Sequence, residues 1–271
     1  MPFINDQFES YYAALYGNRW GTLRESLLQE GAPLPYNHRL TKPYLLDRAS
    51  VLAAQSLRIP GDGSILDAGI LDACAAPGGK SLVIASLMEL HATLLANELS
   101  GERRRRLAKV LDEYLPQNIR ERVTVSGFDA AAAGGKMREH NRFAAILLDA
   151  PCSSERHVIA SEKALAEWTA ARPRFLAKRQ WALLSAAFLL LQNGGSLVYA
   201  TCSLAPAEND AVASRLLEKY KDAVILDPPE FSEGEETRFG RIILPDRCGG
   251  MGPMYVARFR KAERITSAPP Q

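Results

Sequence analysis

The fold is decided by the stretch Phe143-Ala144-Ala145-Ile146-Leu147-Leu148-Asp149-Ala150-Pro151-Cys152-Ser153-Ser154. Its apolar run stops at Asp149, and a proline and a cysteine follow. An unbroken apolar run that ends in a turn signal predicts a strand buried on both faces, as in a parallel sheet. Open α/β sheets bind ligands just outside the carboxyl ends of such strands. We therefore expect Asp149 and Cys152 at a binding site, although the stretch alone also fits a strand followed by a polar turn with a chance cysteine.

Strand-like and helix-like segments alternate along the rest of the chain. Strands are predicted at 64–73, 92–98, 122–126, 143–149, 196–203 and 224–226, with a weakly alternating edge strand at 254–259. One short helix followed by a loop is predicted within the first 40 residues. Further helices are predicted at 44–57, 81–90, 100–116, 162–191 with a break at Pro173, and 206–220. This alternation predicts an α/β fold with a parallel sheet and helices on both faces. Ile-Leu-Asp-Ala occurs twice between residues 64 and 73, which leaves open the copy that forms the strand.

Length and composition are those of a globular chain with one main domain. The 271 residues can bury a full core, and no useful repeat or low-complexity linker divides them. We predict an N-terminal extension over residues 1–40, a single domain over 41–262 and a tail over 263–271. The longest apolar stretch, Trp181–Leu191, is too short to span a bilayer, and the first residues lack the pattern of a signal peptide. These features predict a cytoplasmic protein without membrane contact.

The cysteines and the charges limit which disulfides, metal sites and binding partners the chain can have. Four cysteines in a chain of this size do not indicate a disulfide framework, and no Cys-x-x-Cys or zinc-type spacing occurs. We therefore predict reduced thiols and no metal. The net charge of +2 says little about partners. The basic clusters Arg103–Arg106, Arg172–Arg179 and Arg258–Arg264 fit solvated helix faces and nucleic-acid contacts about equally well.

Glycine and acidic residues follow the first three predicted strands. The turn Ala75-Ala76-Pro77-Gly78-Gly79-Lys80 precedes a helix, and glycines there let backbone N–H groups approach a ligand closely. This turn is neither a Walker A loop nor a G-x-G-x-x-G fingerprint. Glu98 ends the second strand, where an acid in doubly wound folds commonly binds the ribose hydroxyls of a nucleoside cofactor. Asp129 follows the third strand.

A cysteine follows the fourth strand, and another ends the fifth. Cys152 comes just after residues 143–149, and Cys202 lies near the end of residues 196–203. Neighbouring strands lie about 4.8 Å apart. If the two strands are neighbours, both thiols meet at one edge of the sheet, and the interpretation of Cys152 as a chance cysteine fails.

Three motifs together resemble the Sun/Fmu family of S-adenosylmethionine-dependent RNA cytosine-C5 methyltransferases. They are Asp72-Ala73-Cys74-Ala75-Ala76-Pro77-Gly78-Gly79-Lys80, Asp149-Ala150-Pro151-Cys152, and Thr201-Cys202-Ser203 followed by Glu208-Asn209. The resemblance covers residues 44–260, and the combination of the two cysteine motifs is highly specific. It implies a Rossmann-like class I methyltransferase fold. Its sheet would be mostly parallel and seven-stranded, with helices on both faces and a small N-terminal helical extension.

The resemblance also implies a role for each motif residue. Around S-adenosylmethionine it places Cys74, Ala75, Ala76, Pro77, Gly78, Gly79 and Lys80 at the methionine part, Glu98 at the ribose with Arg103 nearby, Asp129 at the adenine amino group, and Asp149 between cofactor and target base. Cys202 is implied as the nucleophile and Cys152 as the residue that releases the product. Asp149 and Lys80 complete the catalytic set, which includes no metal.

The chemistry of the reaction explains these residue types. C5 of cytosine is a poor nucleophile, and a thiolate that adds at C6 makes it reactive. A protonated carboxyl at Asp149 that hydrogen-bonds N3 would stabilise the charge that develops on the ring. A second thiol, or a water near Cys152, would then remove the C5 proton. An ordinary thiol has a pKa of about 8.5, so Cys202 needs local activation, by Lys80 or by binding of the base.

Two details resemble the mitochondrial small-subunit rRNA branch of the family. Cys152 is followed by Ser153-Ser154-Glu155-Arg156-His157, where most members have a glycine soon after Cys-Ser, and Gly252-Pro253-Met254-Tyr255 lies near the end. That branch acts with a helical partner protein that supplies RNA contacts. The resemblance thus implies RNA as substrate, first rRNA and alternatively tRNA, and an accessory RNA-binding protein or a ribosomal subunit as partner. Only about 40 residues precede the core, which leaves the choice of substrate open.

Other interpretations are weaker. DNA cytosine methylases use a proline-cysteine as nucleophile, but no Thr-Cys-Ser follows it there. A non-catalytic RNA-binding or ribosome-assembly factor would keep only the cofactor fold, whereas all the expected catalytic residues are present here. The aromatic residues Tyr11, Tyr12 and Trp20 fit packing better than base stacking, and His157 fits a solvated surface position.

Overall fold

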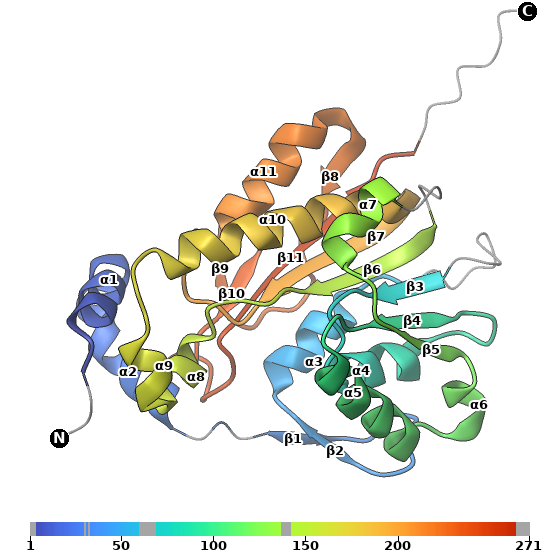
Figure 1. Cartoon of the computed structure of the whole chain (residues 1–271), viewed down its shortest axis with the longest axis horizontal. Coiled ribbons are helices and arrows are strands. Elements are labelled where there is room, and N and C mark those ends of the chain that lie inside the picture. Colours follow the sequence, from blue (N-terminus) through green and yellow to red (C-terminus); the bar gives the residue numbers. More distant parts are fainter. Residues whose placement is uncertain (1–3, 30, 32, 60–68, 137–141, 264–271) are drawn as a thin grey trace, which may run out of the picture.

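The computed structural model describes residues 4–29, 31, 33–59, 69–136 and 142–263 (Figure 1). The strands within this part are β1 (Leu34–Tyr36), β2 (Tyr44–Leu46), β3 (Gly69–Asp72), β4 (Leu94–Asn97), β5 (Val123–Ser126), β6 (Phe143–Asp149), β7 (Leu191–Thr201), β8 (Val224–Leu226), β9 (Glu235–Glu236), β10 (Arg241–Ile243) and β11 (Met254–Lys261).

The helices alternate with these strands over most of the chain. They are α1 (Asp6–Tyr16), α2 (Trp20–Leu28), α3 (Arg48–Gln55), α4 (Gly79–Leu87), α5 (Gly101–Tyr114), α6 (Gln117–Arg120), α7 (Ala130–Lys136), α8 (Glu155–Ala160), α9 (Glu162–Ala166), α10 (Arg172–Leu190) and α11 (Asp210–Tyr220), with the 3-10 turns η1 (Gly17–Arg19) and η2 (Lys221–Ala223). Among the described helices, none is long and apolar enough to cross a bilayer.

The central sheet has the strand order β5-β4-β3-β6-β7-β11-β10-β9, and β8 pairs with β11. The five strands from β5 to β7 are parallel, while β11 runs antiparallel to β7. From the boundary between β3 and β6, the strands follow in chain order on each side: β3, β4 and β5 in one direction, and β6 and β7 in the other. The crevice beside such a boundary, at the carboxyl ends of the strands, is the usual ligand site of a doubly wound fold. The predicted α/β class with a mostly parallel sheet is confirmed.

The sequence of β6 is an unbroken hydrophobic run because both faces of this strand are buried in apolar cores. Ala145 and Leu147 belong to the core beneath α3, α4 and α5. Ile146 and Leu148 belong to the core beneath α10 and α11. Figure 1 shows these two helical layers on opposite sides of the sheet. Since neither face of β6 meets solvent, the strand shows no polar alternation.

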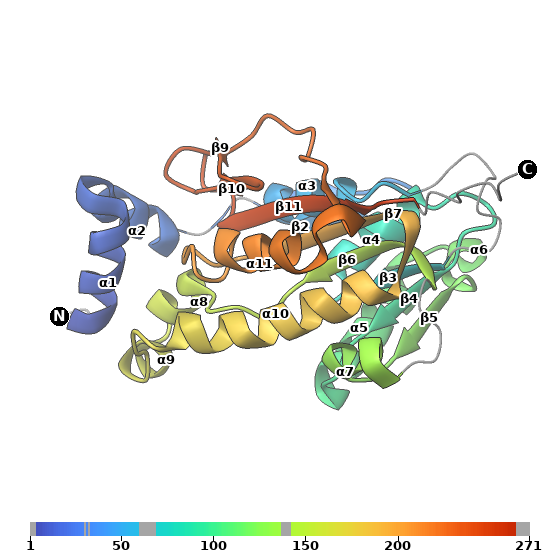
Figure 2. The same ribbon diagram turned by 90° about the horizontal axis from the view of Figure 1, so that it is seen from above.

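The N-terminal region forms two helices where one short helix was predicted. α1 and α2, joined by η1, lie beside α8 and α9 at one end of the molecule, as both Figure 1 and Figure 2 show. A third core cluster holds them there, in which Phe8 and Tyr12 pack against Trp168 and Trp20 packs on Phe8 and Tyr12. Tyr12 is fully buried, so the prediction of a packing role for it is confirmed.

The segment 44–57 differs from the single predicted helix. Tyr44–Leu46 pairs antiparallel with Leu34–Tyr36, and the helix α3 begins only at Arg48. Asp47 has extended backbone angles and accepts a hydrogen bond from the Ala49 N–H, which makes it the N-cap. A cap fixes the first turn of a helix, so the three residues before it are free to form a strand.

The sheet also extends further than predicted, to nine strands among the described residues instead of seven. β11 is an interior strand and not an edge, because it pairs with β7 over residues 255–260 and also with β10 near its start and with β8 near its end. β9 and β10 are too short to give a sequence pattern. Of the two Ile-Leu-Asp-Ala copies, the second lies in β3, and the first lies outside the described residues.

Candidate functional site

The predicted site residues gather at the carboxyl ends of five adjacent strands. Cys74 follows β3, Glu98 follows β4 and Asp129 follows β5 after a short turn. Asp149 is the last residue of β6, and Cys202 directly follows β7. Parallel strands present their carboxyl ends at one edge of the sheet, so residues far apart in sequence share one surface.

The two cysteines are in direct contact. β6 and β7 pair in parallel up to Asp149 and Ala200, and the sulfur atoms of Cys152 and Cys202 lie 3.0 Å apart. Ser154 Oγ lies 3.2 Å from the Cys202 sulfur and 3.5 Å from the Cys152 sulfur. The prediction that the thiols meet at one edge is confirmed.

This contact makes the two thiols chemically unequal. The hydrogen bond that Cys152 donates to the Cys202 sulfur lowers the pKa of Cys202, and burial opposes that effect. The same bond, together with burial, raises the pKa of Cys152 well above its ordinary value. Cys202 is therefore the thiol that ionises first, and the thiolate is the nucleophilic form.

A lysine–aspartate pair lies beside the cysteines. Lys80 Nζ is 2.8 Å from Asp149 Oδ2 and also donates a hydrogen bond of 3.2 Å to Ser50 Oγ. Burial lowers the pKa of Lys80, but the Asp149 carboxylate outweighs it, so the net shift is upward. Lys80 is thus held as an ammonium group next to the site.

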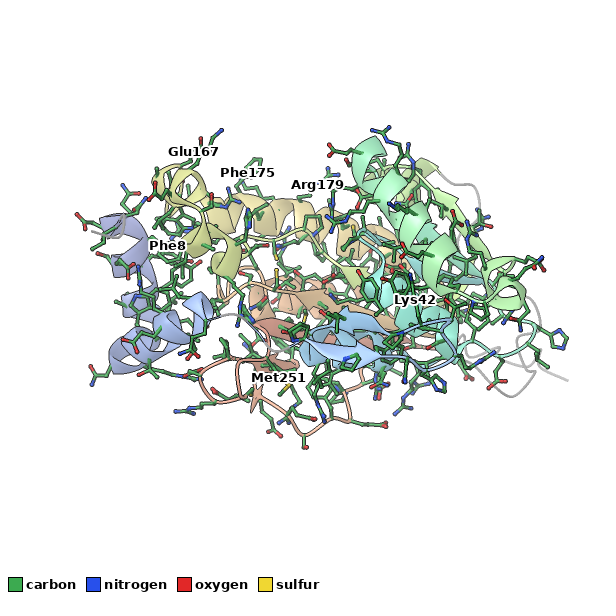
Figure 3. The ribbon with its side chains drawn as sticks, turned by 90° about the horizontal axis from the view of Figure 1, so that it is seen from below. Phe8, Lys42, Glu167, Phe175, Arg179 and Met251 are labelled. Atoms are coloured by element: carbon green, nitrogen blue, oxygen red, sulfur yellow. The ribbon has the colours of Figure 1, made fainter. Side chains whose placement is uncertain are left out.

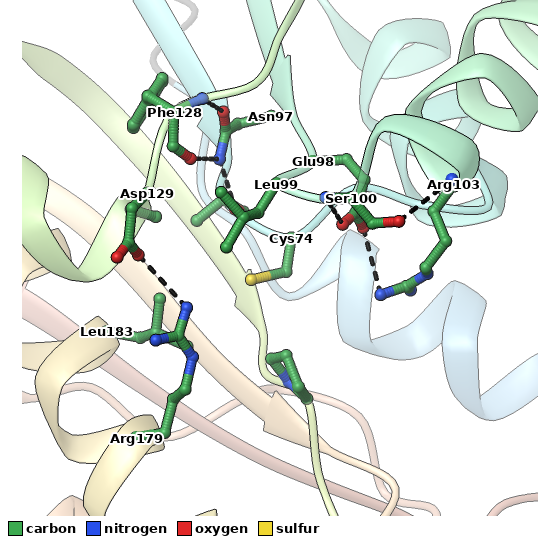
Figure 4. A pocket seen from close by; sticks show the side chains of 13 residues that line it. Cys74, Asn97, Glu98, Leu99, Ser100, Arg103, Phe128, Asp129, Arg179 and Leu183 are labelled. Carbon is green, nitrogen blue, oxygen red and sulfur yellow. Dashed lines mark hydrogen bonds and ion pairs between the residues drawn. The ribbon is translucent and has the colours of Figure 1, made fainter.

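A pocket of about 350 Å³ opens beside the ends of β3, β4 and β5 (Figure 4). Its lining includes Cys74, Glu98, Arg103, Asp129 and Arg179, together with apolar groups of Leu99, Phe128, Pro151 and Leu183. Arg179 forms an ion pair of 3.2 Å with Asp129 across one side. A mixture of apolar walls and a few convergent polar groups is typical of small-molecule sites.

Glu98 carries an oxygen that the described part of the chain leaves without a hydrogen bond. Its Oε1 accepts from the Ser100 N–H at 2.9 Å. Its Oε2 is buried and lies 3.2 Å from Arg103 Nη1, close enough for an ion pair but without hydrogen-bond geometry. Arg103 instead donates to the carbonyl of Ala76 at 2.8 Å. A buried acceptor of this kind is costly to leave unsatisfied, so it is suited to a hydroxyl of a ligand.

A second pocket of about 220 Å³ shares Cys74 with the first and reaches Lys80 and Asp149. Its remaining lining residues are Tyr44, Leu45, Leu46, Asp47, Ser50, Asp72, Ala75, Ala76, Pro77 and Gly79. A side chain at Gly79 would meet the Leu46 Cδ1 atom at 2.7 Å, and Gly78 has φ +120°. The backbone at position 78 therefore requires glycine, whereas a side chain at position 79 would have to displace the end of the Leu46 side chain.

Sequence reasoning missed the residues of 44–50 because it placed them inside a helix. It also missed Gln180, whose Nε2 donates to the Pro151 carbonyl at 3.0 Å. Of the basic cluster on α5, Arg104 donates to the Glu98 carbonyl at 2.8 Å and so supports the chain beside the pocket. His157 is exposed on α8, as predicted.

Comparisons with known proteins agree with this architecture. A solved structure of a methyltransferase homologue from Pyrococcus horikoshii superposes with a TM-score of 0.70 at 22% identity, covering 95% of both chains. This likeness shows a common Rossmann-like class I methyltransferase fold.

Two curated relatives are similar in sequence. Ribosomal RNA small subunit methyltransferase F of Aeromonas salmonicida is 41% identical over 82% of this chain and 46% of its own length. The 5-cytosine rRNA methyltransferase NSUN4 of Bos taurus is 32% identical over 79% of this chain and 58% of its own length. The chain thus spans about half the length of these relatives.

The model of one family matches residues 64–260, which contain all the site residues described above from Cys74 to Cys202. The resemblance inferred from the motifs is thereby confirmed, and the chain belongs to the RsmB/F family of 16S rRNA methyltransferases.

Proposed function

We propose that this protein is an S-adenosylmethionine-dependent RNA cytosine-C5 methyltransferase, with rRNA as its substrate class. The observation that carries the proposal is the contact of 3.0 Å between Cys152 and Cys202 beside the Lys80–Asp149 pair. Attack on a pyrimidine ring needs a nucleophilic thiolate, a group that stabilises the ring charge, and a base for the C5 proton. These three kinds of group stand together at one edge of the sheet.

The larger pocket fits the cofactor. The buried, unsatisfied Oε2 of Glu98 suits the ribose hydroxyls, and Asp129 with apolar Phe128 and Leu183 suits an adenine ring. The turn from Cys74 to Lys80, with its positive-φ glycine at position 78, would hold the methionine part, and Arg103 would support Glu98. When bound, the cofactor supplies a methyl group activated by a sulfonium. The nucleophile, the group that stabilises the ring charge and the base for the C5 proton all come from side chains of this protein.

Cys202 is the nucleophile in this mechanism. Its lowered pKa favours the thiolate, which adds to C6 of cytosine and leaves the ring with an electron-rich C5. Lys80 and Asp149 face the same space, and the Lys80 ammonium stabilises the negative charge that spreads to N3 and O2 during attack. The ammonium of Lys80 holds the Asp149 carboxyl in place.

Cys152 acts in product release. After methylation the C5 proton must leave and the C6–S bond of Cys202 must break. Once Cys202 is bound to the base, Cys152 no longer hydrogen-bonds to a free Cys202 sulfur, which removes the main cause of its raised pKa. The Cys152 thiol can then lose its proton to solvent, and the resulting thiolate accepts the C5 proton, directly or through a water. The departing Cys202 thiolate is then stabilised again by the Cys152 thiol.

The outer face of α10 suits an RNA strand. Phe175 is 71% exposed and stands among Arg172, Arg174, Lys178 and Arg179, with no acidic residue between positions 172 and 181. Figure 3 shows Phe175 and Arg179 on the outward side of this helix. An aromatic ring for base stacking within a basic stretch is the typical composition of a single-strand surface. The target cytosine must be unstacked to reach Cys202.

Transfer of labelled methyl groups tests this function. Incubation with labelled S-adenosylmethionine and total RNA, free rRNA, tRNA and partly assembled ribosomal subunits should label cytosine C5 in rRNA. Label in tRNA alone would support the tRNA alternative. A need for subunits or for an added RNA-binding protein would identify the accessory partner. Absence of transfer to every RNA would favour a non-catalytic binding factor.

Separate alanine variants distinguish the two cysteines. Cys202→Ala should abolish methyl transfer, because no thiolate attacks C6. Cys152→Ala should still attack the base but should accumulate a covalent protein–RNA species, visible as a retarded band on a denaturing gel that RNase removes. Full transfer by the Cys202 variant would overturn the assignment of the nucleophile.

A further inference from the structure

Five fully buried polar residues lie behind the two cysteine turns, and we call them the serine–glutamate cluster: Tyr12, Ser153, Glu155, Ser203 and Glu208. Ser153 directly follows Cys152, and Ser203 directly follows Cys202. Tyr12 comes from α1, more than 140 residues from Glu155 in sequence. The cluster therefore joins the N-terminal helix to both cysteine turns.

Glu208 ties the two turns to each other. Its Oε1 accepts hydrogen bonds from Ser153 Oγ at 2.5 Å and from Ser203 Oγ at 2.9 Å. Its Oε2 accepts from the Ser153 N–H at 3.0 Å and from Gln180 Nε2 at 2.7 Å. The two serine hydroxyls are also 2.9 Å apart. One carboxyl group thus contacts the residue after each cysteine.

Glu155 adds the N-terminal helix to this arrangement. Its Oε1 accepts hydrogen bonds from Ser153 Oγ and from the Tyr12 hydroxyl, and its Oε2 accepts from the Leu204 N–H at 2.9 Å. Tyr16, one turn further along α1, donates to the Leu204 carbonyl at 2.8 Å. The N–H and the carbonyl of Leu204, two residues after Cys202, are therefore both hydrogen-bonded. The N–H is held by Glu155, which Tyr12 of α1 contacts, and the carbonyl is held by Tyr16 of α1.

The two glutamates compete for the same hydrogen-bond partner, the Ser153 hydroxyl. The single hydrogen of the Ser153 hydroxyl cannot serve both carboxyl groups, although both lie within hydrogen-bond distance. Burial and the neighbouring Glu155 raise the pKa of Glu208. A proton on Glu208 that faces the serine oxygens would satisfy the set, whereas two bare carboxylates in a closed interior would repel each other.

Backbone pairing alone does not hold the cysteine turns together. The ladder between β6 and β7 ends at Asp149 and Ala200, with one more backbone bond from the Ala150 N–H to the Ala200 carbonyl. Beyond that point the serine–glutamate cluster joins the two turns by side-chain hydrogen bonds. A displacement of about 1 Å would be enough to break the contact between the two sulfurs.

We propose that Tyr12, Glu155 and Glu208 are positioning residues that set the approach of Cys152 to Cys202, and that α1 is thereby part of the catalytic unit. This inference rests on the proposed function for its consequence in methyl transfer, but the geometry of the thiols can be measured without any RNA. It also gives a role to the glutamate that follows Cys-Ser-Ser in this chain.

Alkylation of Cys202 as a function of pH tests the inference directly. The midpoint is followed by mass spectrometry after short exposure to iodoacetamide, with neither cofactor nor RNA. In Tyr12→Phe, which removes one hydroxyl and keeps the ring, the midpoint should rise by about half a pH unit because Cys152 no longer donates well to Cys202. Tyr11→Phe is the matched control on the same helix, since its hydroxyl has no hydrogen bond within the described residues, and it should leave the midpoint unchanged.

Variants of Glu155 separate positioning from direct electrostatics. The charged groups that face Cys202 are Asp149 and Glu155, which raise its pKa, and Lys80. Removal of the Glu155 charge should by itself lower the midpoint. A higher midpoint in Glu155→Ala, restored in part by Glu155→Gln, is therefore the signature of lost positioning.

Methyl transfer gives the second readout. Tyr12→Phe should lower kcat about tenfold while KM for S-adenosylmethionine stays the same, since neither Tyr12 nor its partner Glu155 lines the cofactor pocket. If Glu155→Ala does not fold, Tyr12→Phe and Glu155→Gln carry the test, with far-ultraviolet circular dichroism as the check. An unchanged Cys202 midpoint in both folded variants would overturn the inference. A wild-type protein that transfers no methyl group would refute the proposed function, whereas the alkylation result would still decide the positioning role.

Discussion

Asp72 ends β3 directly before the glycine turn, and its carboxyl group is almost completely buried. Burial raises its pKa from 3.8 to about 7, while the hydroxyl of Ser81, which donates a hydrogen bond of 2.6 Å, acts in the opposite direction. The Asp149 carboxylate raises it further. At the scale of single residues, the protein therefore contains an aspartate that titrates near neutral pH next to the proposed cofactor.

Asp72→Asn should change how stability depends on pH. Because the folded pKa is raised, the stability that Asp72 contributes is fully present below the unfolded value of 3.8 and is lost as the pH rises through about 7. Within that window the wild type should lose up to about 1.4 kcal/mol per pH unit relative to the variant. Urea unfolding at pH 5, 6, 7 and 8 measures the difference. Parallel pH curves for the two proteins would show that the aspartate does not titrate there.

At the scale of elements, α10 has two faces with different tasks. Its inner face carries Gln180, which bonds both the Pro151 carbonyl and Glu208 behind the cysteine turns. Its outer face carries the exposed Phe175 and the basic residues around it. Side chains three and four residues apart share a helix face, so Phe175, Lys178 and Arg179 form one surface.

Neutralising this surface should weaken RNA binding in a salt-dependent way. Replacement of Arg174 and Lys178 by Gln should lower RNA affinity and reduce the slope of log affinity against log salt by about one per lost phosphate contact. Lys219→Gln on α11 is a control with an exposed lysine outside the proposed surface. Titrations at several salt concentrations provide the slopes. Equal slopes for the variant and the wild type would place RNA elsewhere.

The N-cap of α3 is a second element-scale feature. The Asp47 side chain accepts from the Ala49 N–H at 2.6 Å and from the Gly252 N–H at 3.1 Å, so it also ties α3 to the loop before β11. Asp47→Ala should cost about 1–2 kcal/mol of unfolding free energy. Ser100→Ala removes the cap of α5, whose hydrogen bond to Arg103 is longer at 3.4 Å, and should cost less. Denaturant midpoints decide the order, and a larger loss for Ser100→Ala would contradict it.

At the scale of the whole molecule, the larger pocket exists because the segments that follow β3, β4, β5 and β6 meet at one edge of the sheet beside α10. A ligand that binds the folded state alone stabilises it by about 2.7 kcal/mol at a concentration of 100 Kd. S-adenosylhomocysteine should therefore raise the Tm of the wild type by several degrees. Glu98→Ala should remove most of this shift, because it deletes the buried acceptor. Glu102→Gln, an exposed neighbour on α5, should keep it.

The sequence by itself determined the α/β class and the chemistry of the motifs. The apolar run of β6, the glycine turn and the strand-end positions of Asp149 and Cys152 depend on local patterns, which a single chain displays directly. Alternation also predicted a parallel sheet, whereas the meeting of Cys152 with Cys202 depended on β6 and β7 being neighbours, which the tertiary structure shows.

Only the tertiary structure decided which distant residues complete the site. Tyr44 and Ser50 enter the smaller pocket because Asp47 ends a strand and begins a helix, a local choice that hydrophobic spacing alone did not reveal. Tyr12 reaches Glu155 because an aromatic core holds α1 against α8 and α9, and no sequence period links residues so far apart. Periodicity reports which face of an element is buried, whereas the partner on the other side of that face is set by packing of the whole chain.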